Sequence, residues 1–336
     1  MTRHLGWAKL KSGRSLALVR VQLPDKTHAK AVAALLADQE QMLPPERRRA
    51  WQFFARSLLR RRADEPIINF YLGLLDGQLA GHGAIICSPP IGTMNWVATR
   101  PQYRGQGIAT ILVNTAMADF WTHSGQALFL TTPPGSIAER IYVKLGFRRC
   151  QFRDRPTLSM MRFQGTGFFG GYFAPRRSHV RDLTWADWPR LTALNELPEG
   201  DQLRCARYLL AGPCSFDPVF PEIMHDLSRR IVQQAKVLVS ESGAVVGYAF
   251  LGPRPGSRRE FLLDLYLHAG FADQGETMLR ALQFPRGRTI IYLDYPSSLK
   301  DAALIAAGFT EVLHWNPMEE TRFLPGRARK FDLIKG

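Results

Sequence analysis

A glycine-rich turn between an apolar run and a helical run constrains this chain more than any other segment. Its residues are Gln102-Tyr103-Arg104-Gly105-Gln106-Gly107-Ile108-Ala109-Thr110. Closely spaced glycines let the backbone turn tightly and direct several amide groups at one point. The helical run that starts at Ile108 adds its free first-turn amides and the positive end of its dipole. A strand, a glycine turn and a helix N-terminus in this order predict a pyrophosphate site, where Arg104 supplies forked donors.

Two motifs in this part of the chain resemble the acyl-CoA signatures of the GNAT acyltransferase superfamily. The first is Arg-x-x-Gly-x-Ala, at Arg104, Gly107 and Ala109. The second is a helical segment in which Tyr142 stands four residues before Gly146-Phe147. Because the two motifs occur in the order and at the separation typical of the superfamily, residues 1–164 are identified as a GNAT domain with an intact acyl-CoA motif.

The resemblance implies which residues bind an acyl-CoA donor, most simply acetyl-CoA. The strand residues Val97, Ala98 and Thr99 would align the pantetheine arm and the thioester. The turn would bind the pyrophosphate through Arg104, Gly105, Gln106, Gly107, Ile108, Ala109 and Thr110. One departure is Gly135, which stands where the family often has Asn. The corresponding contact to the pantetheine arm is then either missing or supplied by Ser136.

The resemblance also implies direct attack of an acceptor amine on the thioester, followed by departure of a thiolate. By its position Tyr142 would be the general acid that protonates the departing sulfur. The base that takes a proton from the acceptor stays open, because residues 93–97 contain no carboxylate. His82 on the preceding hairpin strand is one candidate, since an imidazole exchanges protons near neutral pH. A water chain, or an acceptor that arrives neutral, is the alternative.

The predicted elements of residues 1–164 follow the order that the GNAT fold requires. Periodicity and turn signals predict a strand at 15–21, helices at 27–42 and 46–62, a hairpin of 67–75 and 78–87, a strand at 93–98, a helix from 108 to about 124, a strand at 127–131, a helix through Tyr142 and strand material to about 163. On the helix 46–62, Trp51 and Phe54 lie on the face expected to be buried.

Past a glycine-dense linker at 165–179, residues 180–336 repeat the organisation of the first half. Gly243 lies 166 residues after Gly77, Gly275 lies 168 after Gly107, and Gly308-Phe309 lies 162 after Gly146-Phe147. Features at nearly constant offset indicate a diverged duplication. We therefore expect an α/β (α+β) chain of two GNAT-like domains in tandem, each with a mixed, mostly antiparallel central sheet flanked by helices.

The second copy has lost the residues on which the chemistry depends. In the alignment of the two halves, Ala272 replaces Arg104, Thr277 replaces Ala109 and Leu304 replaces Tyr142. Asp273 adds an acid where a pyrophosphate would lie, and its charge would repel that anion. Residues 180–336 are therefore predicted to form a degenerate GNAT-like domain that has a structural or acceptor-shaping role.

The chain is strongly basic, and the excess charge lies in the first half. The net charge is +15, and residues 1–164 hold 23 Lys and Arg against 10 Asp and Glu, whereas the remainder holds 21 against 19. Such a field favours anionic partners, which include CoA, an acidic acceptor and a phosphate backbone. A basic surface that serves only solubility is the alternative. The predicted helix 46–62 presents Arg48, Arg49, Arg56, Arg60 and Arg61.

Three classes of function fit these features. The first is an acyl-CoA-dependent N-acyltransferase that acts on a small-molecule or peptide amine, with an anionic acceptor favoured by the basic half. The second is an aminoacyl-tRNA-dependent transferase of the Fem type, in which the arginines of helix 46–62 would contact tRNA. The third is a non-catalytic, CoA-binding regulatory protein. The retained Arg104, Gly107 and Tyr142 favour the first class over the third.

Other classes of protein are disfavoured by what the sequence lacks. Cys87, Cys150, Cys205 and Cys214 have neither metal-ligand nor C-x-x-C spacing, so no metal is expected. Scattered cysteines of this kind fit the reducing cytoplasm. No apolar run has the length of a membrane span, and the N-terminal residues do not resemble a secretory signal. We therefore expect a cytoplasmic protein without a membrane partner.

Overall fold

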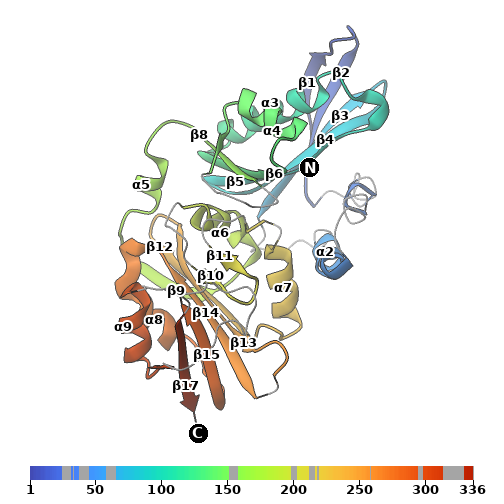
Figure 1. Ribbon diagram of the computed structural model, residues 1–336. Helices are drawn as coiled ribbons and strands as arrows, with labels where there is room; N and C mark the ends of the chain where they lie inside the picture. The colour runs from blue at the N-terminus through green and yellow to red at the C-terminus, as the bar shows by residue number, and fades with distance from the viewer. Residues whose placement is uncertain are drawn as a thin grey trace. The chain divides into compact units, whose positions relative to one another are not determined.

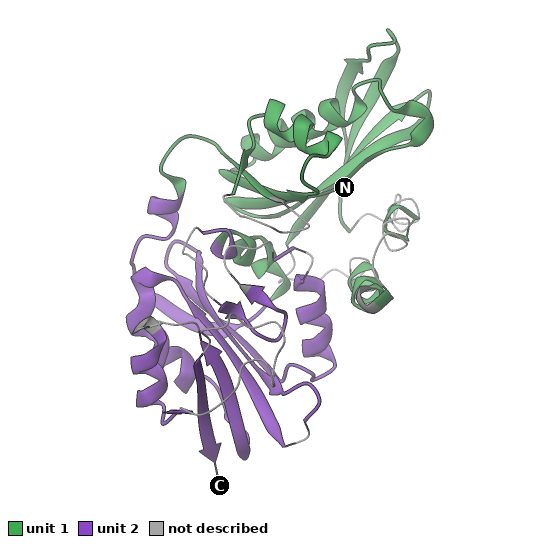
Figure 2. Cartoon of the chain, in the orientation of Figure 1, with its two compact units in different colours: residues 1–168, 184–193 green, residues 169–183, 194–336 purple. Residues whose placement is uncertain are grey.

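We describe the fold from a computed structural model of the chain. The described residues are 1–24, 32, 34–37, 45–57, 66–150, 158–197, 203–211, 216–217, 219–257, 259–293, 298–312 and 329–335. The chain forms two compact units, which are residues 1–168 with 184–193, and residues 169–183 with 194–336 (Figure 1 and Figure 2). Each unit contains a mixed sheet with flanking helices, as the sequence predicts.

Unit 1 contains an eight-stranded sheet in the order β1-β2-β3-β4-β5-β6-β8-β7. Its strands are β1 (Thr2–Lys9), β2 (Ser15–Gln22), β3 (Ile67–Leu75), β4 (Gln78–Ser88), β5 (Ile91–Thr99), β6 (Ala127–Thr132), β7 (Arg148–Arg149) and β8 (Leu158–Phe163). Its helices are α2 (Pro45–Ser57), η1 (Pro101–Tyr103), α3 (Ile108–Thr122), α4 (Ile137–Lys144), η2 (Trp185–Asp187) and the first part of α6 (Trp188–Asn195). The pair β5 and β6 is parallel, whereas the other neighbouring strands are antiparallel.

One face of this sheet packs against α3 and α4. Ile85 and Met94 of the sheet share a buried cluster with Leu112 of α3 and Tyr142 of α4. The strand β5 approaches α3 closely, because a Cβ atom at Gly92 would lie only 2.8 Å from the ring of Phe120. Burial of this apolar surface is the main favourable term for the unit.

The opposite face carries the aromatic side of α2. Phe70 and Tyr71 are consecutive on β3 and therefore point to opposite faces of the sheet. Tyr71 belongs to the cluster beneath α3, whereas Phe70 lies within ring-contact distance of Trp96, which in turn contacts α2. The predicted inward face of this helix is confirmed, because Trp51 and Phe54 are both buried.

Some predicted elements lie partly outside the described residues. Of the helix predicted at 27–42, residues 32 and 34–37 are helical. The Trp51 indole Nε1 donates a hydrogen bond of 2.9 Å to the Leu36 carbonyl, which joins this segment to α2. Leu58, Leu59, Arg60 and Arg61, which the sequence assigns to the second helix, lie outside the described residues.

Strand β1 is an element that the sequence analysis did not predict. It pairs antiparallel with β2 along residues 2–9, with an irregularity between His4 and Gly6. Arginine, histidine, glycine and lysine interrupt the alternation that identifies a strand, and every residue of β1 is at least partly exposed. The hydrogen bonds to β2, which no local pattern encodes, therefore define this strand.

Unit 2 contains a seven-stranded sheet in the order β16-β17-β15-β14-β13-β12-β9. Its strands are β9 (Ser178–Asp182), β12 (Gln234–Ser240), β13 (Val245–Pro253), β14 (Glu260–Leu267), β15 (Gly287–Leu293), β16 (Thr310–Glu311) and β17 (Arg329–Lys335), with a separate hairpin of β10 (Leu203–Cys205) and β11 (Leu210–Ala211). Its helices are α5 (Phe168–Tyr172), the end of α6, α7 (Phe220–Ser228), η3 (Ala269–Gln274), α8 (Gly275–Arg280) and α9 (Ser298–Ala306).

The two sheets match strand for strand. Taken from β9 to β16, the order in unit 2 equals that of β2 to β7 in unit 1, and the parallel pair β14–β15 stands where β5–β6 stands. Corresponding helix ends also match. The Phe147 amide donates to the Tyr142 carbonyl at 3.0 Å, and the Phe309 amide donates to the Leu304 carbonyl at 2.9 Å. The tandem duplication predicted from the sequence is therefore confirmed.

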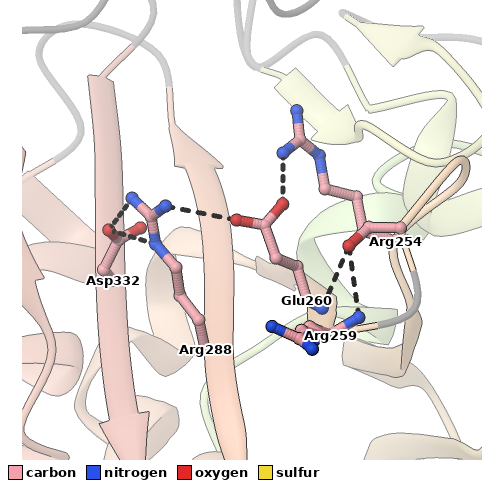
Figure 3. A network of polar contacts seen from close by, with 6 residues as sticks. Arg254, Arg259, Glu260, Arg288 and Asp332 are labelled. Atoms are coloured by element: carbon pink, nitrogen blue, oxygen red, sulfur yellow. Dashed lines mark hydrogen bonds and ion pairs between the residues drawn. The ribbon is translucent and has the colours of Figure 1, made fainter.

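A ladder of charges crosses the sheet of unit 2 (Figure 3). Glu260 accepts from Arg254 at 2.6 Å and from Arg288 at 3.2 Å. The Arg288 Nε atom donates to Asp332 at 2.8 Å, and this hydrogen bond raises the pKa of the guanidinium. These four residues come from the end of β13 and from β14, β15 and β17. Because two cations face two anions, the ladder neutralises itself and joins four neighbouring strands.

A buried ion pair fastens α3 to the sheet of unit 1. The Arg20 guanidinium of β2 donates to both carboxylate oxygens of Asp119 at 3.0 and 2.9 Å. The Tyr71 hydroxyl of β3 donates to the same carboxylate at 2.8 Å. Burial and the neighbouring carboxylate raise the pKa of Tyr71. These three residues connect β2, β3 and α3. Removal of Asp119 would leave the buried positive charge of Arg20 without a counter-charge.

We predict that Asp119→Ala lowers the free energy of unfolding by about 3–5 kcal/mol, because Arg20 would remain buried without a counter-charge. The matched control is Asp182→Ala, which removes the partner of Lys236 and changes a side chain that is 79% accessible. That change should cost less than about 1 kcal/mol. Urea unfolding of both variants measures the difference, and equal costs would contradict a structural role for Asp119.

Candidate active site

The glycine turn adopts the conformation that its sequence predicts. Gly105 and Gly107 have φ angles of +79° and +87°, which a side chain would strain. Gly107 is the N-cap of α3, and a Cβ atom at either glycine would meet nothing within 4 Å. The amides of Ile108 and Ala109 lie in the first turn of α3, where a helix offers no internal acceptor. The turn therefore presents backbone donors to open space.

Two side-chain contacts hold this turn. The Arg104 Nε atom donates to the Thr99 carbonyl at 3.3 Å, which ties the turn to the end of β5. The Ser12 hydroxyl donates to the Gln106 side chain at 3.0 Å. Ser12 lies between β1 and β2, so the strand that the sequence analysis missed contributes to the site. Arg104 and Thr110 are exposed, and Ala109 is partly exposed.

Strand β5 leads to this turn with one edge open. Among the described strands, the pairing of β5 with β6 ends at Thr93 and Phe129. From residue 94 to residue 99, backbone groups on that edge are consequently outside the ladder. Val97, Ala98 and Thr99 lie on this stretch and are partly exposed. These three residues and the glycine turn are thus consecutive parts of one segment, in which the unpaired end of β5 leads into the N-terminus of α3.

A β-bulge interrupts β5 at this open stretch. His82 pairs with Ala98 and Ala84 pairs with Asn95, so Trp96 and Val97 together oppose Gly83. Trp96 has a φ angle of +55°, which costs a residue with a side chain about 1–3 kcal/mol. A Cβ atom at Gly83 would lie 3.2 Å from a methyl carbon of Val97, so the glycine permits this approach. The sequence analysis did not predict this bulge.

His82 lies on the face of the sheet that is opposite to α3. It is buried, with 7% of its surface accessible. Alternation along β4 places it on the side of Ala84, since Ile85 belongs to the cluster beneath α3. Asn95 and Thr93 are polar neighbours on β5, where the Asn95 amide donates to the Thr93 hydroxyl at 3.0 Å. His82 therefore lies one strand away from the open edge.

Tyr142 extends from α4 into the cluster beneath α3. Its side chain is 6% exposed and its ring centroid lies 5.7 Å from that of Phe147. Burial raises the pKa of the phenol to about 12. The hydroxyl therefore keeps its proton at neutral pH, as a general acid must.

Ser136 and Glu139 fix the start of α4. The Ser136 hydroxyl accepts from the Glu139 amide at 3.1 Å and lies 3.1 Å from the Thr132 hydroxyl. The Glu139 carboxylate accepts from the Gly135 amide at 2.6 Å and from Arg149 at 2.5 Å. The hydrogen bond from Gly135 is the main cause that lowers the pKa of Glu139. Ser136 is thus an N-cap, and its hydroxyl is already engaged at the place where a pantetheine contact was predicted.

We predict that Glu139→Gln destabilises the protein at neutral pH and that this difference disappears in acid. The folded-state pKa lies below the ordinary glutamate value of about 4.3, so the carboxylate contributes stability above that pH and loses it as the pH falls. Urea unfolding between pH 7 and pH 3 measures the gap. Glu276→Gln, in an exposed pair with Arg280, is the control and should show little gap throughout. A gap for Glu139→Gln that persists unchanged in acid would contradict this account.

The corresponding region of unit 2 is built differently. Gly275, which aligns with Gly107, has helical angles and packs so tightly that a Cβ atom would lie 2.6 Å from Ala303. The β13–β14 ladder runs from Gly247 to Pro253 without a bulge. Asp264, on β14 just past the parallel pairing with β15, accepts from the Ala206 amide at 2.6 Å. Among the described residues, the degenerate half therefore lacks the left-handed glycine turn and the bulge of unit 1, although β14 also continues past its pairing with β15.

The described residues offer neither a metal-binding cluster nor a membrane-spanning helix. No cluster of three or more His, Cys, Asp and Glu side chains in this part of the chain could hold a metal ion. Among the helices in the described ranges, none has the length and apolar character needed to cross a bilayer. Of the four cysteines, Cys87, Cys150 and Cys205 are buried, and Cys214 lies outside the described residues.

Comparison with known proteins identifies the family of the first half. The family model described as Acetyltransferase (GNAT) family matches residues 31–147. This match spans the open edge of β5, the glycine turn and Tyr142. Residues 31–147 therefore match the GNAT acetyltransferase family, and the match does not extend to the rest of the chain. A search of curated proteins gives no match.

Several solved structures are similar to part of the chain. The GNAT domain of S. lividans PAT is 8% identical, with 47% of this chain and 96% of that chain covered and a TM-score of 0.37. An acetyltransferase from Streptococcus agalactiae is 17% identical, with 44% and 98% covered and a TM-score of 0.34. The PaiA N-acetyltransferase from Thermoplasma acidophilum, in complex with coenzyme A, is 13% identical, with 43% and 99% covered and a TM-score of 0.34. Because these identities and TM-scores are low, the family assignment rests on the family model.

Proposed function

We propose that the chain is an acyl-CoA-dependent N-acyltransferase, with acetyl-CoA as the simplest donor, and that unit 1 holds its active site. The observation that carries this proposal is the open edge of β5 leading into a glycine turn at the N-terminus of α3. An extended pantetheine arm can hydrogen-bond to such an edge as an added strand would. The pyrophosphate then reaches the amides of the turn and the positive end of the helix.

The donor's thioester would lie where β5 leaves β6. A neutral amine attacks the carbonyl carbon, the carbon–sulfur bond breaks and the electrons leave with the sulfur as thiolate. The nitrogen, positively charged after attack, loses a proton to water as the amide forms. Backbone amides along residues 97–99 are the donors available to the oxyanion that forms during attack. Tyr142, which is protonated at neutral pH and whose pKa burial raises to about 12, donates its proton to the thiolate.

The acceptor ammonium must lose a proton before it attacks. His82 is the candidate base in unit 1, since it lies opposite Ala98 of β5. A buried imidazole in this position would take the proton directly or through water. The alternative is an acceptor that arrives neutral, in which case His82 has a structural role.

We predict that Gly107→Asp and Arg104→Glu each abolish CoA binding. Both changes place negative charge where the pyrophosphate would lie, and an aspartate side chain in place of Gly107 would also strain a positive φ angle. The matched control for the first is Gly243→Asp, since Gly243 has a φ angle of +78° and equally open surroundings in unit 2. Arg176→Glu, at an exposed arginine of unit 2, is the control for the second. Calorimetric titration with CoA measures affinity, and unchanged affinity in the two site variants would remove the assignment.

We predict one CoA per chain. Unit 2 has a helical Gly275 and an acidic Asp273 at the corresponding turn, and neither favours an anion. Native mass spectrometry and calorimetry count the bound molecules, and two CoA molecules per chain would contradict the prediction. Binding of tRNA without any binding of CoA would instead favour the aminoacyl-tRNA-dependent class.

We predict that Tyr142→Phe lowers kcat by about 10²–10⁴-fold and leaves the affinity for acyl-CoA nearly unchanged. In the unchanged protein, kcat should not fall between pH 7 and pH 10, because the acid loses its proton only near its pKa of about 12. Thiol release during turnover measures both effects. Tyr172→Phe, at a buried tyrosine of unit 2, should leave kcat unaltered. Equal turnover in Tyr142→Phe would mean that another group or solvent protonates the thiolate.

A further inference from the structure

Trp96 is the residue of unit 1 whose conformation most requires an explanation. Its positive φ angle is unusual for a bulky side chain, and such strain persists only where the surroundings enforce it. The bulge sets the direction of the side chain, since residues 96 and 97 share one partner residue on β4. Val97 packs against the cluster beneath α3, whereas Trp96 contacts the aromatic rings on the other face. The matching ladder of unit 2 has no bulge.

Three rings hold the Trp96 indole in place. Phe70 stacks on it with a centroid distance of 5.6 Å and an interplanar angle of 21°. Trp51 meets it edge-on at 5.4 Å, and Phe54 is tilted against it at 5.8 Å. The last two rings come from α2. Even with these contacts Trp96 remains partly exposed.

A segment beyond the predicted linker supports the same cluster. Trp188 meets Phe54 edge-on at 5.1 Å, and Trp185 lies 5.7 Å from it. The Ser88 hydroxyl at the end of β4 donates to the Ala186 carbonyl at 2.6 Å, which anchors this segment. Residues 184–193 belong to unit 1. They therefore pack against α2 through Phe54, the ring that also contacts Trp96.

Trp96 lies on the part of β5 where an acceptor would approach the thioester. It lies on the open edge of β5, next to the residues proposed to align the thioester. Its side chain lies on the face shared with His82, whereas Tyr142 lies on the face beneath α3. A group that approaches the thioester from the face opposite to the general acid would meet the indole.

We propose that Trp96 determines acceptor specificity, and that its indole binds a flat, aromatic group carried close to the reacting amine. This inference rests on the proposed function, because it requires an acyl donor along β5. Aromatic rings gain from stacked or edge-on contacts beyond the burial of their area. Trp185 and Trp188 are then positioning residues, since they act on Trp96 through Phe54 of α2.

The test compares two amines of similar size that differ in flatness, 2-phenylethylamine and 2-cyclohexylethylamine, with acetyl-CoA saturating. We expect the unchanged protein to prefer the phenyl compound in kcat/KM by about twofold to tenfold, as for an aromatic pair. Trp96→Phe should keep this preference. Trp96→Asn should lose it, and asparagine tolerates a positive φ angle, so the fold should be retained.

Positioning is tested with Trp188→Leu, which should raise KM for 2-phenylethylamine severalfold and leave KM for acetyl-CoA unchanged. Trp7→Leu on β1, where the indole is 68% exposed, is the matched control and should change neither value. CoA affinity, measured by calorimetry for each variant, reports separately on folding and on the donor site.

The outcomes separate the two proposals. If the unchanged protein does not prefer 2-phenylethylamine, or if the preference survives in Trp96→Asn, the proposed role of Trp96 is wrong. CoA binding would still support the proposed function. An unchanged protein that binds no CoA overturns the proposed function itself. Loss of preference in Trp96→Asn with CoA affinity intact, and its retention in Trp96→Phe, supports the inference.

Discussion

The separation of β5 from β6 is the constraint on which the rest of unit 1 depends. Three parallel pairs, from Ile91 with Ala127 to Thr93 with Phe129, hold the strands together. Beyond these pairs β6 remains paired with β8. Among the described strands, the edge of β5 that faces β6 is no longer paired. An unpaired edge inside a sheet carries backbone donors and acceptors that need satisfaction. In the proposed function, the acyl-CoA donor supplies them and its pyrophosphate lies where the strand ends at the N-terminus of α3.

The duplicated half indicates which features belong to the fold and which to the chemistry. Both sheets keep the strand order, the parallel pair and a left-handed glycine before phenylalanine at the end of a helix, at Gly146 and Gly308. Unit 1 differs by the bulge in β5 and by positive φ angles in the turn before α3. In unit 2, Asp264 is buried beyond the parallel pairing, where burial raises its pKa and backbone amides satisfy it. The architecture therefore persists without the bulge and without the left-handed glycine turn.

The sequence predicted the parts of this structure that depend on local signals. Gly107 and Gly146 occupy left-handed conformations that glycine favours, so turns and helix ends were predictable from them. Strand β1 was not, because its hydrogen bonds to β2, rather than its own residues, define it. The bulge at Trp96 was not predicted from the sequence for a similar reason. A register shift is a property of two paired strands, and neither strand alone encodes it. The Glu139–Arg149 pair likewise depends on how α4 meets β7.

The aromatic cluster changes how the boundary between the halves should be understood. A boundary at residues 165–179, as predicted from glycine content, assigns Trp185 and Trp188 to the second half. The contacts of those two rings with Phe54 group them with unit 1 instead. Large aromatic rings bury much apolar surface each, so α2 would lose a substantial part of its packing without them. Because Phe54 of α2 also contacts Trp96, the packing around Trp96 includes a segment that follows the linker. The first sheet and the start of the second half consequently form one packing unit, which a split at the glycine-rich segment would divide.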